Sequence, residues 1–204
     1  MFKDHQKVNC PSCGDNLPLH FHYSKLAQCS SCGSHIFLDD EGARLAGEQS
    51  VLPNTPSLIA LNQVFTYNYE NYTPIGHIRY GAGRNRWDEW WVVDSNGKGL
   101  WLSIDDGDYI LEKEVNLTLP TYSFKSLKLG QDIDGWTITE LDEGTCLGYE
   151  GELPEVVEVG EMHYYAHLSK KSGVMLTIEF FANTKKFYSG KWLDPYEIRK
   201  ALSS

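Results

Sequence analysis

Apolar and polar positions alternate over short segments in most of the chain beyond residue 57, and this period of two predicts β-strands. The clearest strands are predicted at 75–80, 86–94 and 100–104. The last two flank Asn96-Gly97, a pair that tolerates the positive φ angles of a tight hairpin turn. Short strands at even spacing predict an antiparallel meander or a small SH3-like barrel in this part of the chain.

A second group of strands is predicted in the later half, at 135–141, 145–150, 162–168, 174–181 and 186–188. The end of the chain has a different pattern. The run Asp194-Pro195-Tyr196-Glu197 combines a capping aspartate, a proline at the first helical position and a glutamate at the third. This capping box predicts a short C-terminal helix, whose apolar stripe would consist of Ile198, Ala201 and Leu202.

Four of the five cysteines form two C-x-x-C pairs, Cys10 with Cys13 and Cys29 with Cys32, with fifteen residues between the pairs. This spacing is typical of a zinc ribbon, because each pair folds into a tight turn that directs two thiolates at one ion. Four sulfur ligands close the coordination shell, so the expected Zn²⁺ has a structural role. The alternatives are two disulfides, a redox pair or an iron–sulfur cluster.

Together these patterns predict a mainly β protein in four parts. The zinc ribbon occupies residues 1–38, and a linker rich in turn-forming residues occupies 39–56. A first small antiparallel β unit follows at 57–120, and a second one, which includes the C-terminal helix, occupies 121–204. Two Leu-x-Gln triplets lie 68 residues apart and raise the hypothesis that the two β units arose by duplication.

The composition of the 204-residue chain narrows the class of protein. A hydrophobic fraction of 41% and a charged fraction of 23% are those of a folded protein, and an aromatic fraction of 13% favours strands. The net charge of −10 argues against a general nucleic-acid binder. No run approaches the roughly 20 apolar residues of a membrane-spanning helix. The N-terminus lacks the apolar stretch of a secretory signal, so a cytoplasmic location with reduced thiols is expected.

The run Trp87-Asp88-Glu89-Trp90-Trp91 is the strongest candidate for chemistry outside the cysteines. Neighbouring side chains on a strand point to opposite faces, so Asp88 and Glu89 are not expected to share a site. Trp87 and Trp91 share one face and Trp90 lies on the other, which indicates a strand that is covered on both sides. The alternative is a ligand cleft between the two β units, lined by Trp87, Trp90, His77 and Trp101.

The remaining nucleophiles and histidines predict no further site. His163 and His167 share one face of a strand but lie about 13 Å apart, too far to share one metal ion. The chain contains no recognisable Ser/His/Asp or Cys/His signature, so no catalytic residue is assigned. Cys146 stands alone and is expected to be a small buried hydrophobe.

Acidic residues are concentrated between Lys128 and Lys170, where ten occur without an interrupting lysine or arginine. A solvated acidic face is one interpretation of this segment. The other is a docking surface for a basic protein partner or a polycation, because opposite charge steers association. The candidate docking residues are Glu150, Glu152, Glu155, Glu158 and Glu161.

Several of these motifs occur in a known order. The two Cys-x-x-Cys-Gly pairs precede the run 74–80, which is followed by Trp87-Asp88-Glu89-Trp90 and then by Gly99-Leu100-Trp101-Leu102-Ser103. In this order and spacing the chain resembles bacterial proteins of the domain of unknown function 4178 family, often built as a zinc ribbon plus this domain. The resemblance implies that Cys10, Cys13, Cys29 and Cys32 are zinc ligands. It also implies an accessory role in a bacterial stress or membrane-associated system, without an activity or catalytic residues.

The leading hypothesis is a non-enzymatic binding or scaffold protein with a structural zinc site. It depends on the closed metal site, the acidic segment and the lack of a catalytic set. The first alternative is a small-ligand binder or enzyme that uses the tryptophan-lined cleft. The second is nucleic-acid binding through the zinc ribbon, which is disfavoured because the ribbon carries little positive charge.

Overall fold

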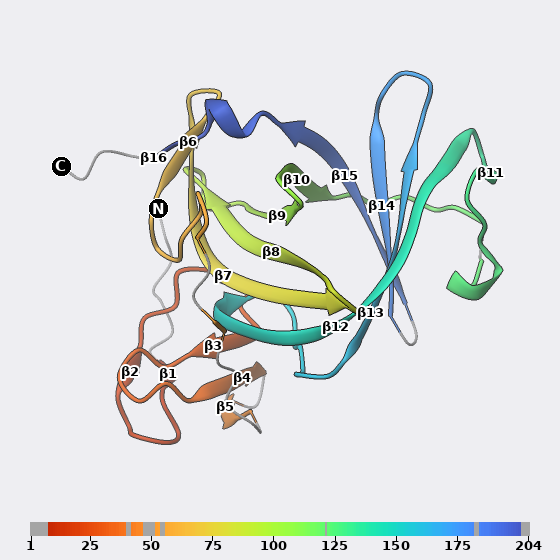
Figure 1. The fold of residues 1–204 in the computed structure, drawn as a ribbon. Helices are drawn as coiled ribbons and strands as arrows, with labels where there is room; N and C mark the ends of the chain where they lie inside the picture. The colour runs from red at the N-terminus through yellow and green to blue at the C-terminus, as the bar shows by residue number, and fades with distance from the viewer. Residues whose placement is uncertain are drawn as a thin grey trace.

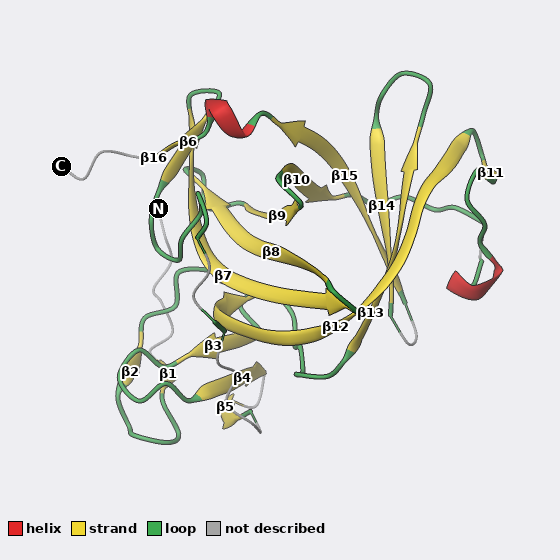
Figure 2. Ribbon diagram, viewed as in Figure 1, coloured by secondary structure: helices red, strands yellow, loops and turns green. Residues whose placement is uncertain are grey.

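The computed structural model describes residues 8–39, 42–46, 52–53, 56–120, 122–181 and 184–200. Strands dominate these ranges, and the helical elements are two single 3₁₀ turns (Figure 2). No helix in the described ranges is long and apolar enough to cross a membrane. The elements are β1 (Val8–Asn9), β2 (Asn16–Leu17), β3 (Leu26–Gln28), β4 (His35–Asp39), β5 (Gly42–Leu45), β6 (Phe65–Tyr67), β7 (Glu70–Ala82), β8 (Asn85–Asp94), β9 (Gly99–Asp105), β10 (Asp108–Glu114), η1 (Phe124–Ser126), β11 (Asp132–Ile133), β12 (Trp136–Leu153), β13 (Met162–Ser169), β14 (Met175–Phe180), β15 (Lys185–Leu193), η2 (Pro195–Glu197) and β16 (Arg199–Lys200).

Eight antiparallel strands form a closed barrel, in the order β7-β8-β9-β10-β15-β14-β13-β12, with β12 pairing back to β7 (Figure 1). Two pairings join the halves of the chain. Strand β10 pairs with β15 from Tyr109 opposite Leu193 onward, and β12 pairs with β7 from Thr145 opposite Gly81 onward. The mainly β prediction is therefore confirmed, whereas the prediction of two small β units is wrong. Each four-strand half has two open edges, and joining the halves satisfies the backbone groups of all four edges.

The N-terminal segment, which we define as residues 8–39 and 42–46, continues the sheet of the barrel. Strand β3 pairs with the end of β12, where Ala27 lies opposite Glu152 and Leu26 opposite Leu153. Strands β4 and β5 extend this sheet further. Strand β5 lies within the stretch predicted as a linker and pairs with β4, with Asp39 opposite Gly42. Residues 40–41 lie outside the described residues.

Side chains of β8 alternate between the inside and the outside of the barrel. Trp87 and Trp91 pack in the cluster that fills the barrel, whereas Trp90 and Val92 pack in a second cluster with Phe65 of β6. All four β8 side chains are buried. The prediction of a strand covered on both faces is confirmed. The outer cover includes Phe65 and Tyr67 of β6, Ile59 before β6 and Ile198 before β16.

The C-terminus keeps the predicted cap but lacks the predicted helix. The carboxylate of Asp194 accepts a hydrogen bond from the backbone N–H of Tyr196 at 2.9 Å, and Pro195–Glu197 form a single 3₁₀ turn. The chain then becomes extended, and β16 pairs with β6 through Arg199 opposite Thr66. The free edge of β6 offers backbone hydrogen bonds, which the strand satisfies and a surface helix would not. Residues 201–204 lie outside the described residues.

Two glycines allow the barrel to close where β7 and β12 cross. Gly76 lies opposite Gly151 in the register of these strands. A Cβ atom on Gly76 would lie 1.9 Å from the carbonyl oxygen of Glu152, and one on Gly151 would lie 2.2 Å from the carbonyl oxygen of Ile75. Gly151 also has a φ of +76°, in the left-handed region that favours glycine. This crossing therefore excludes any side chain at either position.

We expect Gly151→Ala to lower the free energy of unfolding by about 2–5 kcal/mol in urea denaturation. The positive φ costs roughly 1–2 kcal/mol for alanine, and the contact with the Ile75 carbonyl adds roughly 1–3 kcal/mol of overpacking. The matched control is Gly173→Ala, because Gly173 has a φ of +81° and open space around its Cβ position. The control should lose only the roughly 1–2 kcal/mol of backbone strain. Equal losses in the two variants would contradict a tight crossing.

Candidate functional site

The four cysteines of the two C-x-x-C pairs lie together at one end of the N-terminal segment. Their sulfur atoms all lie within 4.8 Å of one another, with 3.7 Å between Cys10 and Cys32 and 3.8 Å between Cys13 and Cys29. Each pair forms the same turn, in which the glycine after the second cysteine donates its N–H to the carbonyl of the first at 2.8 Å. No disulfide joins these four, which are free thiols. The cluster could therefore bind one metal ion.

One buried carboxylate fastens the N-terminal segment to the barrel. Glu152, on β12, accepts hydrogen bonds from the backbone N–H of His20 at 2.7 and 2.9 Å and from that of Phe21 at 3.1 Å. The Ser24 hydroxyl donates to it at 2.8 Å, and Nδ1 of His20 lies 2.6 Å from Oε1. Hydrogen bonds to a charged acceptor are among the strong ones. The carboxylate therefore fixes the loop between β2 and β3 on the barrel.

The four residues predicted to line a tryptophan cleft lie on two faces of the barrel wall. His77 and Trp90 are on the outer face and stack with ring centroids 3.8 Å apart. Trp101 is buried with Trp91 in the inner cluster, and Trp87 lines a cavity inside the barrel. The barrel wall thus separates the rings that the sequence analysis grouped in one cleft.

His77 belongs to a polar network on the outer face. Its Nε2 lies 2.7 Å from Asp88 and its Nδ1 lies 3.0 Å from Glu150, while Nε of Arg79 donates to Asp88 at 2.7 Å. Burial lowers the pKa of His77, but the two carboxylates outweigh this effect and raise the pKa above its ordinary value. The imidazole therefore links β7, β8 and β12 through its contacts with Asp88 and Glu150.

The five glutamates predicted as a docking face have different environments. Glu152 is buried in the contact just described, and Glu150 is paired with an imidazole of β7. Glu155 forms an ion pair with a lysine of β15. Only Glu158 and Glu161 of the five are exposed. Three of the candidate docking residues are thus engaged in internal contacts.

The inside of the barrel carries acidic side chains around a cavity of about 250 Å³. Glu89 on β8, Glu112 on β10 and Glu179 on β14 line this cavity and are only 7%, 4% and 6% exposed. His163 on β13 also lines it, with Nε2 3.8 Å from Oε1 of Glu89. Buried glutamates are rare without a partner, so this cavity is a candidate binding site.

The three interior carboxylates differ in the partners that they have. Nε1 of Trp87 donates to Oε1 of Glu89 at 3.0 Å, and the hydroxyl of Thr177 donates to Glu112. Oε2 of Glu179 has no hydrogen-bond partner among the described residues. An unsatisfied buried carboxylate oxygen is energetically costly, and such a group is expected to have a ligand or a proton.

Burial shifts the titration of the interior groups. It raises the pKa of Glu89 to about 8, with a further contribution from the charges of Glu112 and Glu155. Burial also raises the pKa of Glu112, and it raises that of Glu179 well above the ordinary range together with the neighbouring carboxylates. Burial lowers the pKa of His163 to about 4, so its imidazole is neutral at pH 7.

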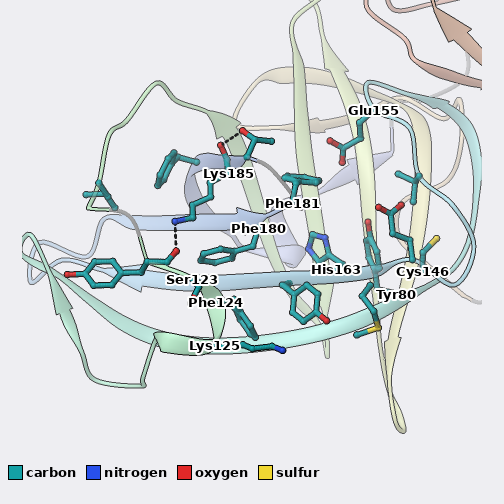
Figure 3. Close-up of a pocket in the computed structure, with 18 of the residues that line it drawn as sticks. Tyr80, Ser123, Phe124, Lys125, Cys146, Glu155, His163, Phe180, Phe181 and Lys185 are labelled. Carbon is teal, nitrogen blue, oxygen red and sulfur yellow. Dashed lines mark hydrogen bonds between the residues drawn. The ribbon is translucent and has the colours of Figure 1, made fainter.

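A larger groove of about 1180 Å³ lies beside the barrel (Figure 3). Its walls come from the connection after β10, from β13 and from the ends of β14 and β15. His163, Tyr80, Cys146 and Glu155 lie toward one end of the groove, away from Phe124 and Lys125 (Figure 3). His163 therefore lines both the groove and the interior cavity. The aromatic lining includes four half-buried rings, those of Phe124, Phe180, Phe181 and Phe187.

The interior cavity was missed by the sequence analysis, although one signal for it was present. Alternation along β8 places Glu89 on the same face as Trp87 and Trp91. A glutamate between two tryptophans on an inward face is either partnered or functional. The other cavity residues come from strands far apart in the sequence, and only barrel closure brings them together.

We expect the free energy of unfolding of Glu112→Gln to exceed that of the wild type by an amount that grows with pH. Because the folded-state pKa of Glu112 is raised above 4.5, its contribution to stability is full below that value and is lost as the pH rises through the folded pKa. The difference should grow by at most about 1.4 kcal/mol per pH unit. Urea denaturation from pH 5 to pH 8 measures it, and parallel pH curves for the two proteins would contradict it.

Residues 60–195 match the family described as domain of unknown function (DUF4178). This range begins before β6 and ends within η2, so it covers the whole barrel and both cavities, whereas the four clustered cysteines precede it. No curated protein and no solved structure matches the chain. The family match covers well over half of the chain, and the chain therefore belongs to the DUF4178 family.

Proposed function

We propose that this protein is a non-enzymatic binding protein that holds a small, largely apolar ligand in the groove beside its barrel. The observation that carries the proposal is the concave aromatic wall of a groove of about 1180 Å³. Small-molecule sites are concave, mostly apolar and of roughly 300–1,000 Å³, with a few polar groups that orient the ligand. The groove slightly exceeds this range and therefore has room for a small molecule.

The rings of the aromatic wall contact one another. Phe124 on η1 packs against Tyr164 in a tilted arrangement at 5.1 Å and against Phe180 edge-on at 5.6 Å between ring centroids. These contacts hold rings that line the groove. Rigid aromatic walls bind apolar ligands at a low cost in conformational entropy.

Polar groups near the two ends of the groove supply orientation. Lys125 lies at the Phe124 end, and Glu155 and His163 lie at the other. Lys185, on β15, donates to the backbone carbonyl of Tyr122 and so ties the connection after β10 to the barrel. The groove thus offers a cationic end at Lys125 and a polar end at His163 and the Glu155–Lys186 ion pair to an elongated ligand.

The proposal includes a structural zinc ion at the four cysteines. Thiolate ligands in a compact set of four suit Zn²⁺, and a closed shell leaves no position for a substrate. A cytoplasmic location, which keeps thiols reduced, is part of the same proposal. The segment has only a small core of its own, around Leu17, Ala27 and Ile36, so the ion would supply much of its stability.

Scaffolding through the acidic segment is the weaker candidate, because three of the five glutamates have internal partners. An accessory role in a bacterial stress or membrane-associated system is compatible with a ligand-binding protein. We therefore place ligand binding ahead of protein docking in this proposal.

We expect the fluorescent probe 1-anilinonaphthalene-8-sulfonate to bind at one saturable site and Phe124→Ala to weaken that binding at least fivefold. The ring of Phe124 forms part of the aromatic wall, and the anionic group of the probe suits Lys125. The matched control is Tyr196→Ala, because Tyr196 is 86% exposed on η2 and does not line the groove. Equal affinity of the two variants, or no saturable binding by the wild type, would reject the groove as the ligand site.

We expect Cys29→Ser to contain one zinc ion per chain fewer than the wild type by elemental analysis. A structural site of this kind binds with about 10–16 kcal/mol in model peptides, so the variant should also become sensitive to trypsin within the N-terminal segment. The exposed Arg44 offers a cleavage site there. Cys146→Ala is the control, since Cys146 is buried outside the cluster and should leave the zinc content unchanged. An unaltered zinc content in Cys29→Ser would refute zinc at this cluster.

A further inference from the structure

We propose that Glu89, His163 and Glu179 bind a divalent transition-metal ion inside the barrel. The three side chains come from β8, β13 and β14, which the closed barrel brings together. Their ligand atoms all lie within 4.8 Å of one another. This site is separate from the four cysteines, and it does not depend on the proposed function of the groove.

The spacing of the three groups fits an ion after small side-chain rotations. Ligand atoms placed about 2.1 Å from one ion lie at most about 4.2 Å apart. Nε2 of His163 and Oε1 of Glu89 are already 3.8 Å apart. The remaining separations, at up to 4.8 Å, close with movements of less than about 1 Å.

Glu179 gives an independent reason for a cation at this place. Its side chain is 94% buried, by subtraction of its 6% exposure, and its Oε2 has no hydrogen-bond partner among the described residues. A proton on this carboxyl would add a donor that also needs a partner, whereas a bound cation would satisfy the oxygen directly. The unsatisfied Oε2 of Glu179 therefore indicates a positively charged ligand.

The charged groups around the cavity also indicate a bound cation. Within the described residues, Glu89, Glu112 and Glu179 form no ion pair with a lysine or arginine. Lys186, whose charge acts on Glu179, is itself paired with Glu155. Buried charges in proteins are normally paired or coordinated to a metal, and none of these three carboxylates is paired with a lysine or arginine of the described residues.

Neighbouring side chains hold the proposed ligands in position. Nε1 of Trp87 donates to Oε1 of Glu89 at 3.0 Å, which orients that carboxylate. A Cβ on Gly144 would lie 2.1 Å from the Trp87 ring, so the glycine makes room for the indole. The imidazole of His163 stacks on Tyr80 with ring centroids 4.6 Å apart. Supports of this kind are typical of metal sites.

The site has open coordination positions. His163 lines both the outer groove and the interior cavity, so its imidazole lies between the two. Three protein ligands leave at least one position of a four-coordinate ion for water or another small ligand. Two carboxylates and one imidazole favour Mn²⁺, Fe²⁺ or Zn²⁺, whereas four thiolates disfavour Mn²⁺.

The test is a titration with Mn²⁺ of the full-length protein loaded with one zinc ion per chain, followed by electron paramagnetic resonance. The four thiolates take this single zinc ion in preference to the interior oxygen and nitrogen donors. Zinc occupies the cysteines in this preparation, so Mn²⁺ reports on oxygen and nitrogen sites. We expect one bound Mn²⁺ per chain and a ¹⁴N coupling from the imidazole of His163 in a pulsed experiment. No bound Mn²⁺, or bound Mn²⁺ without the nitrogen coupling, would overturn the proposal.

Variants locate the ion. Glu179→Gln keeps the shape of the side chain and should weaken Mn²⁺ binding at least tenfold, as should Glu89→Gln. The matched control is Glu161→Gln, because Glu161 is an exposed acid beside the groove and should leave the affinity within twofold. Circular dichroism without added Mn²⁺ verifies that each variant is folded. Equal losses in Glu179→Gln and Glu161→Gln would show a diffuse charge effect and would overturn the site.

Discussion

The fold depends on the pairing of β12 with β7, because this one contact turns a curved sheet into a barrel. The two strands meet at Gly76 and Gly151, where the backbone carbonyls of Ile75 and Glu152 occupy the space that a Cβ would need. Everything inside the barrel follows from this closure. Without it, β8 and β14 would lie in one open sheet, and Glu89 and Glu179 would not face a common enclosed interior.

Closure also explains the polar character of the interior. An eight-stranded barrel has an interior that side chains can just fill, or that can hold one small ligand. Large rings such as Trp87, Trp91 and Trp101 fill one part of this interior, and the carboxylates surround what is left. The apolar rings exclude water and so intensify the electrostatics of the acidic groups.

The sequence predicted the local features of the molecule well. The strands around the Asn96-Gly97 turn, the cysteine cluster and the Asp194 cap all follow from short-range chemistry. The joining of the halves was not predicted, because alternation specifies a strand and its faces but not the distant strand with which it pairs. The C-terminal helix failed for a related reason, since the pairing of β16 with β6 overrides a local cap.

The candidate sites differ in the same way. The four cysteines lie in two short pairs, and their spacing predicts one site. Glu89 and His163 lie on different strands, and the sequence does not predict that they meet. His163 was weighed only against His167 on its own strand, although its nearest carboxylate is on β8. The predicted tryptophan cleft groups residues that the fold separates. Residues close in sequence on β7 and β8 lie on the inner and outer faces of the barrel wall.

Strand β12 has one further consequence. Its first part belongs to the barrel, and its last two residues, Glu152 and Leu153, pair with β3 of the N-terminal segment. Leu26 and Phe37 of that segment also pack in the same core as Trp91 of the barrel. A continuous strand and a shared core join the described residues of the two parts. Any molecule that touches both would meet a single preformed surface, and its association would lose no entropy to the ordering of one part against the other.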